Sequence, residues 1–545
     1  MKIPLKVFLL IIAGTTIWSL TMVKSGLVYS SGMGFWGPNG HDGVWHVALI
    51  ESLSRGSLEM PTFAGEALKN YHIGFDLVLA IVHKLTQIPT VTLYFQIVPP
   101  ILAFLVGYLT YEFVSTWRKD KKEAFWAAFF VYFAGSFGWV LSLIRGGGLG
   151  GESTFWAQQA ISTLVNPPFA LSLVLMLLGL ISLLKKKWLL AVVSFGALIQ
   201  VKAYAGILSL IGLFVAGIFE YLKEKKLSLL KVFAGASLVS ILLTLPFIAS
   251  LSLLVIRPFW FLETMMGFGD RVGWQKFYSA MTNYVLAGSW LKAFLAYSAA
   301  FLIFLVGNLG TRIVSLAFMR KSLRKLSWTM IFIFSVILAG TLLPMFLLQK
   351  GTAWNTIQFF YYSLFFLGIL AGISLATYKK GIIVVVILLT IPTTIGTLRH
   401  YLPARPPAKI SLGELEALAF LSEQPQGVVL TYPFDRAAAK AAAVKPPRSL
   451  YLYESTAYVA AFGKKTVFLE DEVNLDIMGY QWPDRREEIE NFLDSLDHQK
   501  GWSFLRESNI TYVYWLKGQG ARLGEGQLGI TRIFENSEVD IYRVD

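Results

Sequence analysis

Long apolar runs fill the first 400 residues of the chain. A helix needs about 20 apolar residues to cross ~30 Å of hydrocarbon, so these runs predict membrane-spanning helices. The first run follows Met1-Lys2 without a convincing cleavage site, which favours an uncleaved first helix over a signal peptide. The run at 188–200 is short for a span. The eleven predicted spans are 1–23, 91–116, 124–144, 168–184, 188–200, 204–222, 228–250, 284–307, 327–348, 357–377 and 381–398.

The segment 73–88 tests this arrangement because it is apolar but short. It carries Asp76, His83 and Lys84, and a span here would move the next four basic residues to the other side of the membrane. We therefore expect an interfacial or re-entrant helix.

The pattern changes after the Pro-rich stretch YLPARPPAK at 401–409. Helical patterns at 412–424 and 484–496 alternate with strand patterns at 427–433, 465–470, 510–516, 530–534 and 539–544. The sequence therefore predicts a polytopic helical membrane domain at 1–398 and a small α/β domain at 399–545.

Composition supports this reading. The chain is 55% hydrophobic and only 15% charged, against about 25% charged in ordinary soluble domains. Its mean hydropathy is +0.58, which excludes a soluble globular protein. The absence of Cys excludes disulfides, thiolate metal sites and cysteine nucleophiles.

Charge predicts the orientation. Residues 1–398 carry 31 basic and 13 acidic residues, whereas 399–545 carry 17 basic and 21 acidic ones. With the N-terminus inside, the short inner segments hold 19 basic residues and the longer outer segments hold 9. By the positive-inside rule we expect a multi-pass cell-membrane protein with a cytoplasmic N-terminus and an extracytoplasmic C-terminal domain. The excess of basic residues therefore indicates cytoplasmic loops of a membrane protein, not a nucleic-acid-binding surface.

The first outer loop gathers the polar residues that could carry chemistry. Asp42 follows a Gly- and Pro-rich turn and precedes the amphipathic stretch VWHVALIESL, so it either caps that helix or acts as a base. His46 lies four residues on, and Lys69 and His72 follow before the interfacial segment. Such a cluster is either a solvent-exposed loop or a binding site for a phosphate-bearing lipid.

These residues carry a resemblance to the GT-C superfamily of membrane glycosyltransferases, which use polyprenyl-phosphate sugars. The matching elements are HDG at 41–43, His46-x3-Ile50-x4-Arg55-Gly56, then Pro61, Gly65 and LKNYHIG at 68–74. The element QVKAYAG at 200–206 resembles the family's short hairpin between two helices. Two departures stand out: Gly43 follows the acid where many members have a second acid, and Asn70 follows the Lys where they have Pro.

The resemblance implies roles for three of these residues. Asp42 falls on the family's catalytic acid. Lys69 falls where the bacterial lipid A aminoarabinose transferases carry a Lys that meets the lipid phosphate, and Lys202 falls in the hairpin that typically shows a Lys at the outer surface. The chemistry suits the residues, because an inverting transfer needs one carboxylate base, while a phosphate leaving group needs cations rather than an acid. Lys69, Lys202 or Arg257 could supply those cations.

Other charged residues allow two interpretations each. Glu152 is a second candidate for substrate binding, in the Gly-rich outer loop 145–159, or else part of a flexible loop that caps a helix. Lys202 is either a phosphate contact or a surface turn residue. The acidic run 470–476 lacks the EF-hand spacing, which favours a solvated loop. We predict no metal site from these spacings, and a divalent cation held by Asp42, Glu152 and a His stays open.

The sequence thus predicts a membrane glycosyltransferase that transfers a sugar from a polyprenyl-phosphate donor to a lipid, glycan or protein acceptor on the outer face. Two alternatives remain. A transporter or lipid flippase is disfavoured because the spans are nearly free of charge and no repeat is visible. A non-catalytic scaffold whose tail binds glycan or protein is left open by the two departures from the family pattern.

Overall fold

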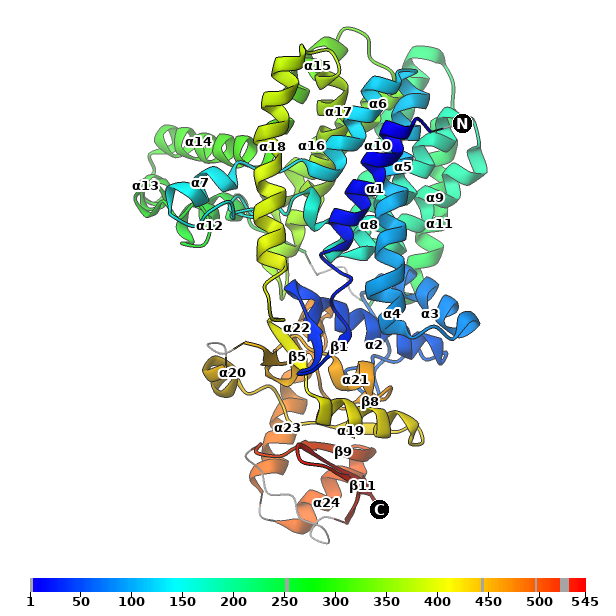
Figure 1. The fold of residues 1–545 in the computed structure, drawn as a ribbon, viewed down its shortest axis with the longest axis vertical. Coiled ribbons are helices and arrows are strands. Elements are labelled where there is room, and N and C mark those ends of the chain that lie inside the picture. The colour runs from blue at the N-terminus through cyan, green and yellow to red at the C-terminus, as the bar shows by residue number, and fades with distance from the viewer. Residues whose placement is uncertain (1–2, 250–253, 443–445, 496, 520–528) are drawn as a thin grey trace. The chain divides into compact units, whose positions relative to one another are not determined.

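The computed structural model describes the whole chain except residues 1–2, 250–253, 443–445, 496 and 520–528 (Figure 1). The contacts divide it into two compact units. Unit 1 comprises residues 1–21, 99–246 and 254–401, and unit 2 comprises residues 22–98, 247–253 and 402–545. Each unit is described by itself below.

Unit 1 is a bundle of helices that follow the predicted apolar runs. Within the described residues, eight helices are long and apolar enough to cross a membrane, or nine if the bent pair α6–α7 forms one span. The other two predicted spans are the shorter helices α1 and α9, so eleven spans are not confirmed, although every predicted run is helical. The long helices, the bent pair and the two shorter helices are α1 (Leu5–Ser19), α5 (Val98–Arg118), α6 (Lys121–Phe133), α7 (Gly138–Ile144), α8 (Pro167–Leu184), α9 (Trp188–Val201), α10 (Ala203–Glu224), α11 (Ser228–Thr244), α14 (Trp290–Leu309), α16 (Trp328–Phe346), α17 (Gln358–Leu375) and α18 (Lys380–Tyr401).

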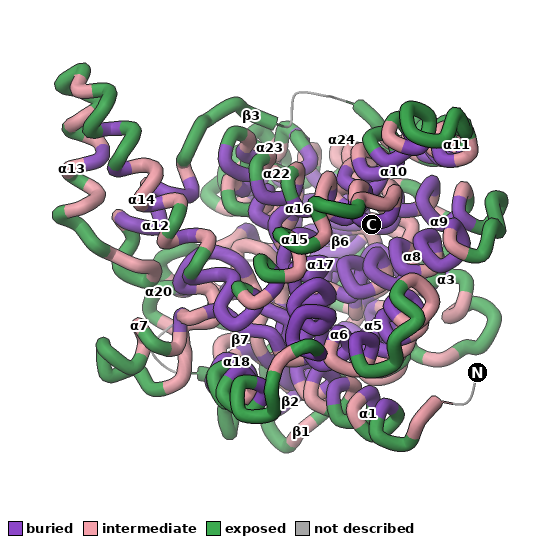
Figure 2. The backbone as a smooth tube through the Cα atoms, turned by 90° about the horizontal axis from the view of Figure 1, so that it is seen from above, coloured by how far each residue is buried: buried purple, intermediate pink, exposed green. Residues whose placement is uncertain are grey.

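Helix α17 forms the core of unit 1. It is apolar all round, and every residue from Tyr362 to Leu375 is buried, as the tube in Figure 2 shows. Gly372 lets it approach α6 closely, because a Cβ there would lie 2.2 Å from the backbone nitrogen of Ala127. Small residues at helix contacts are the usual means of close packing in membrane bundles.

Short elements complete unit 1. The strands β3 and β4 form an antiparallel pair. Helix α15 and the start of α1 lie toward the same end of the unit in Figure 1, as expected if both are on one side of the membrane. These elements are β3 (Leu254–Ile256), α12 (Trp260–Gly267), α13 (Gln275–Leu286), α15 (Ser315–Ser322) and β4 (Leu347–Gln349).

Unit 2 begins with the segment predicted as the first outer loop. Strands β1 (Leu27–Tyr29) and β2 (Gly32–Phe35) form a hairpin, and α2 (Asp42–Ser54) and α3 (Gly74–Thr86) follow. Helix α3 lies on the segment expected to be an interfacial helix, and it exposes Leu77, Val78, Ile81 and Leu85 on its surface. That apolar face fits a helix lying at a membrane surface. The short α4 (Thr90–Thr92) leads back toward α5.

The tail folds as the predicted small α/β structure. Its five-stranded sheet has the order β10-β11-β9-β6-β8, in which β6 is parallel to β8 and β9 while β9, β11 and β10 are antiparallel. The pattern located α19, α23 and all five strands, but it missed α20, α21, α22 and α24. The elements are α19 (Leu412–Glu423), β6 (Val428–Leu430), α20 (Arg436–Ala442), α21 (Tyr458–Phe462), β8 (Thr466–Val467), α22 (Glu472–Met478), α23 (Trp482–Asp494), α24 (His498–Glu507), β9 (Ile510–Leu516), β10 (Ile530–Glu535) and β11 (Val539–Val544).

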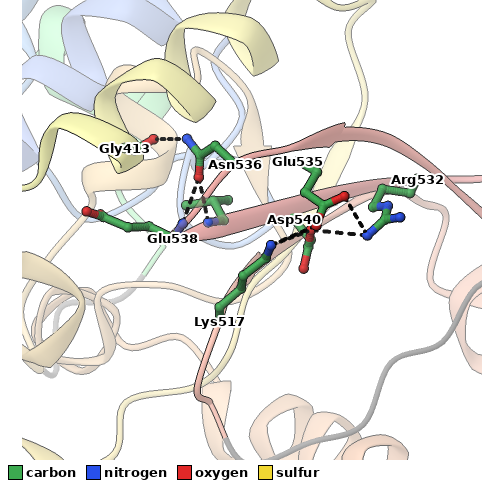
Figure 3. Close-up of polar contacts among 8 residues, drawn as sticks. Gly413, Lys517, Arg532, Glu535, Asn536, Glu538 and Asp540 are labelled. Atoms are coloured by element: carbon green, nitrogen blue, oxygen red, sulfur yellow. Dashed lines mark hydrogen bonds and ion pairs between the residues drawn. The ribbon is translucent and has the colours of Figure 1, made fainter.

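Ion pairs hold one end of this sheet (Figure 3). Lys517 contacts both Glu535 and Asp540, at 2.9 and 3.6 Å, and Arg532 contacts the same two carboxylates at 2.9 and 3.7 Å. The amide of Asn536 donates to the carbonyl oxygen of Gly413, which ties the turn between β10 and β11 to the start of α19.

Within unit 2 the tail and the first loop share backbone hydrogen bonds. Strand β5 (Ala408–Ile410) pairs with β2 on one side and with β7 (Arg448–Ser449) on the other, which gives a sheet of order β1-β2-β5-β7. The amides of Val467 and Glu470 donate to the carbonyl oxygens of Pro61 and Thr62, at 2.8 and 3.0 Å. Two segments separated by some 300 residues of bundle therefore form one compact unit.

Candidate functional site

The six candidate residues fall in both units. Asp42, His46, Lys69 and His72 lie in unit 2, and Glu152 and Lys202 lie in unit 1.

Asp42 is the first residue of α2, and His41 occupies the N-cap position. Its side chain is 55% exposed, and the Nδ1 atom of His41 lies 2.9 Å from Oδ1 of Asp42. A carboxylate in the first turn is stabilised by the helix dipole. Gly43 accounts for the departure from the family pattern, because a Cβ at this position would lie 2.6 Å from the ring of Phe95. A second acid cannot follow Asp42 here without moving that ring.

His41 contacts Asp42 and also responds to the charge of a carboxylate in the tail, Asp471. Burial lowers the pKa of His41, but the charge and hydrogen bond of Asp42, together with the charge of Asp471, outweigh that effect and raise the pKa. Its ring also stacks on Tyr453, with 6.4 Å between ring centroids. The guanidinium of Arg448 lies over the same Tyr453 ring, 3.5 Å from its centre, and its charge opposes the rise in the pKa of His41.

Asp471 is the residue that reading the sequence missed. The run 470–476 was expected to be a solvated loop, but Glu470, Asp471 and Glu472 are buried, so that expectation was wrong for these three residues. Asp471 adopts φ +58°, caps α22 and accepts a hydrogen bond of 2.7 Å from the Asn474 side chain. Burial raises the pKa of Asp471 to about 6. Asp followed three residues later by Asn before an apolar stretch was the available signal for a cap.

Glu470 is buried against the start of α21. Its two carboxylate oxygens accept hydrogen bonds from the amides of Val459 and Ala460, at 3.0 and 3.1 Å. Burial raises the pKa of Glu470 to about 8, although these amides oppose the shift. The carboxyl group is therefore partly protonated near neutral pH.

His46 is a buried member of the loop. Its Nδ1 lies 2.8 Å from Oδ1 of Asp76 on α3, and its ring stacks on Tyr94 with 5.4 Å between centroids. This pair ties α2 to α3. His72 is half-buried and stacks on Tyr71 at 4.7 Å, and the Tyr71 hydroxyl accepts a hydrogen bond of 2.9 Å from the indole of Trp45.

Lys69 packs against the tail. Its ammonium lies 4.3 Å from the centre of the Tyr480 ring and 3.7 Å from a carboxylate oxygen of Glu66. Its backbone amide donates to the Tyr480 hydroxyl at 3.1 Å, and that hydroxyl donates to the carbonyl oxygen of Ala67 at 2.7 Å. The position of Lys69 is thus fixed by backbone contacts as well as by its charge.

In unit 1, Lys202 is buried and Glu152 is half-buried in a turn. The carboxylate of Glu152 accepts hydrogen bonds from the Gln159 amide at 2.6 Å and the Ser162 hydroxyl at 2.8 Å, and burial raises its pKa to about 7. Lys202 joins α9 to α10 as the resemblance implied, but it is only 5% exposed, which contradicts the surface-turn reading. Its ammonium lies 3.4 Å from the Asn166 side-chain oxygen.

Among the residues that the structure describes, no three His, Asp or Glu side chains come together in a way that could hold a metal ion. The arrangement that is present offers an exposed carboxylate oriented by a histidine, buried carboxyls whose pKa values are raised, and fixed cations. These are the parts of acid–base chemistry and anion recognition.

Comparison with known proteins gives the fold. No protein-family model matches the sequence, and curated proteins give no significant match. Among solved structures, the chain is similar to the Archaeoglobus fulgidus oligosaccharyltransferase tethered with an acceptor peptide containing the NVT sequon, with 13% identity and a TM-score of 0.50 over 94% of this chain and 69% of that one. The apo form of the same enzyme gives 11% identity, a TM-score of 0.50 and the same coverage.

A third match is ArnT from Cupriavidus metallidurans bound to undecaprenyl phosphate, with 12% identity and a TM-score of 0.38 over 99% of this chain and 98% of that one. The fold assignment rests on the oligosaccharyltransferase, since its TM-score is the higher. This similarity agrees with the apolar helices of unit 1 and with the small α/β structure of the tail. The chain is a multi-pass membrane protein whose fold is similar to that of the Archaeoglobus fulgidus oligosaccharyltransferase.

Proposed function

We propose that this protein is an integral-membrane glycosyltransferase that transfers a sugar from a polyprenyl-phosphate donor to an acceptor at the outer face of a prokaryotic cytoplasmic membrane. The observation that carries the proposal is the exposed carboxylate of Asp42 at the start of α2, with His41 Nδ1 at 2.9 Å from its oxygen. The GT-C fold and the resemblance of the first loop support it.

The proposed chemistry is a single inverting displacement. Asp42 takes the proton of the acceptor hydroxyl or amide as the acceptor oxygen or nitrogen forms a bond to the sugar C1. The bond between C1 and the phosphate oxygen breaks, and polyprenyl phosphate leaves with the electron pair. Protonated His41 beside Asp42 favours the ionised carboxylate, since a neighbouring positive charge stabilises the charged form.

Cations stabilise the leaving phosphate in this proposal. Lys69 is the first candidate, and its ammonium must then exchange Glu66 for the phosphate. Lys202 is the second, and its burial would strengthen its interaction with an anion. His46, His72 and Glu152 are proposed to bind or orient substrate groups. Glu152 suits a hydrogen bond to a sugar hydroxyl, because its raised pKa makes a protonated carboxyl available.

The orientation is part of the proposal. The excess of basic residues in the predicted inner segments supports a cytoplasmic N-terminus and an extracytoplasmic tail. A lipid-linked donor, a lipid, glycan or protein acceptor, and the surrounding membrane lipids are the proposed partners. The chemistry needs no metal, and a divalent cation would be an addition to this residue set.

The test is donor turnover by the purified full-length protein in detergent. Polyprenyl-phosphate-linked hexoses, pentoses and N-acetylhexosamines are supplied with radiolabelled sugar, and release of polyprenyl phosphate is measured with and without membrane lipid extract as the acceptor source. We expect turnover of at least one donor class, lost in Asp42→Asn and kept in Asp476→Asn, an exposed Asp of α22. Absence of turnover with every donor, or equal turnover by both variants, would overturn the proposal.

A further inference from the structure

Unit 2 contains a cavity of which the proposed chemistry uses only Lys69 and its ion-pair partner Glu66. Its volume is about 720 Å³, within the range of cavities that bind small ligands. The segment 63–69 and Phe468 form one part of its wall, and helices α23 and α24 form the other. The first loop and the tail therefore build this cavity jointly, within one compact unit.

The base of the cavity is aromatic and holds its cations in place. Arg485 lies between two rings, with its guanidinium carbon 3.6 Å from the centre of Phe63 and 4.6 Å from that of Phe468. Its Nη1 donates to the carbonyl oxygens of Ala64 and Phe468 at 2.9 and 2.8 Å. A guanidinium carries five N–H donors, so the fixed group has further donors to offer a ligand.

Helix α24 presents its polar side chains at a regular spacing. Lys500, Ser503, Phe504 and Glu507 all line the cavity, and their spacing places them on one face of the helix. The hydroxyl of Ser503 donates to Glu507 at 2.7 Å. On α23, Asp484 and Glu488 also lie four residues apart and line the same cavity.

The charges in the wall nearly balance, which decides the class of ligand. Three cations (Lys69, Arg485 and Lys500) face four carboxylates (Glu66, Asp484, Glu488 and Glu507). An anionic ligand would be repelled by the carboxylates. An apolar ligand would displace water from the charged groups without replacing its hydrogen bonds. A neutral molecule with many hydroxyl groups can donate to the carboxylates and accept from the cations at once.

We propose that this cavity binds a neutral oligosaccharide, as the glycan part of an acceptor. That the bound oligosaccharide is an acceptor rests on the proposed glycosyltransferase function. Binding of the oligosaccharide in the cavity does not. Lys69, which lines the cavity over the Tyr480 ring, and its partner Glu66 are shared with the proposed donor phosphate contact. The hydroxyl-binding groups of α23 and α24 lie apart from it in the sequence and can be changed separately.

The experiment measures binding by the full-length protein in lipid nanodiscs. Neutral trisaccharides of glucose, mannose, galactose and N-acetylglucosamine are the probes, detected by saturation-transfer NMR and titrated by microscale thermophoresis. Acetylated tripeptides serve as the competing class. The test variant is Asp484→Asn combined with Glu488→Gln, which keeps the bulk of both side chains and the backbone contacts of Arg485. The matched control is Glu487→Gln, an exposed residue of the same helix that does not line the cavity.

We expect at least one trisaccharide to bind, with a Kd raised about tenfold in the double variant and unchanged in the control. Tenfold corresponds to about 1.4 kcal/mol, in the range of one or two weakened hydrogen bonds. No binding of any trisaccharide, binding that the double variant leaves intact, or binding of the tripeptides alone would overturn the proposal. Asp42→Asn separates it from the proposed function: loss of transfer with trisaccharide binding intact is expected, and a protein that never transfers sugar but binds trisaccharides through this cavity would refute only the transferase.

Discussion

Replacing Asp42 by Asn tests the proposed mechanism most directly. Asn keeps the shape of the side chain and its place in the first turn of α2, but it cannot take a proton. If Asp42 is the general base, sugar transfer should fall by about 10²- to 10⁴-fold, the usual contribution of such a group. At about 1.36 kcal/mol for each factor of ten, that loss corresponds to roughly 2.7–5.5 kcal/mol of transition-state stabilisation.

The structural cost of the same change is much smaller. Asp42 is 55% exposed, so screening keeps its contact with His41 near the low end of the ~0.2–1 kcal/mol typical of surface pairs. Its favourable position at the start of α2 contributes about 0.3–1 kcal/mol more. The free energy of unfolding should therefore fall by no more than about 1–2 kcal/mol, well below the loss expected in transfer.

The assay follows initial rates of sugar transfer at saturating donor, with thermal melting of the same samples in parallel. Asp476→Asn, a solvent-exposed Asp in the same unit, is the control for a generic charge change. A melting temperature close to that of the native protein together with a loss of at least 100-fold would support Asp42 as the base. Undiminished transfer by Asp42→Asn would remove this residue from the mechanism and direct attention to Glu152.

Four further predictions follow from the same contacts. Lys69→Ala should raise the KM for a polyprenyl-phosphate donor more than it lowers kcat, as measured in the transfer assay, and an unchanged KM would assign the phosphate contact elsewhere. Gly43→Ala should lower the melting temperature by forcing about 1–3 kcal/mol of overpacking against Phe95, whereas Gly269→Ala, with open space around it, should not. Burial raises the pKa of Glu470 to about 8, so the folded protein holds the proton of this carboxyl more tightly than the unfolded chain does. The free energy of unfolding should therefore fall by up to a few kcal/mol as pH rises from about 4.5 to 8. Glu470→Gln should flatten that part of the melting profile. Reporters fused at residues 320 and 400 should be active on the cytoplasmic and outer sides respectively, and a cytoplasmic signal at 400 would contradict the predicted orientation.

The helices of the bundle could be predicted because their signal is local. A run of apolar residues bounded by Lys and Arg marks a helix at 203–224 or 328–346 without reference to anything else in the chain. Whether such a helix spans the membrane depends on its length. Helices α1 and α9 are 15 and 14 residues long, so their apolar character does not by itself show that they span it. The strands of the tail were also found locally, from the alternation in ITYVYWL and VDIYRV.

The candidate site could be predicted only in part, because its members come from distant segments. Asp42, His46 and Lys69 lie close together in the first loop, so the sequence alone identifies them as candidates, and the resemblance gave Asp42 its proposed role. Nothing near Asp42 in the sequence indicates that His41 also responds to the charge of Asp471, more than 400 residues later. An acidic run in isolation is more often solvated, whereas this one is packed against distant segments, including the first loop, which shares backbone hydrogen bonds with residues 467–470.

These shared hydrogen bonds also change what the tail is expected to need for folding. The sequence favours a domain at 399–545 that folds by itself, yet β5 pairs with β2, and Val467 and Glu470 donate to the backbone of the first loop. A fragment of 405–545 would expose the edge of β5 and these two amides to water, and each lost hydrogen bond would cost its net contribution of about 0.5–1.5 kcal/mol. A fragment that nevertheless melts cooperatively would show that the five-stranded sheet is sufficient, and an unstructured one would show that the first loop is part of the same folding unit. The second outcome is the one these contacts favour, because the segment 22–98 that carries Asp42 shares backbone hydrogen bonds with β5 and with Val467 and Glu470, at the start of the acidic run that carries Asp471.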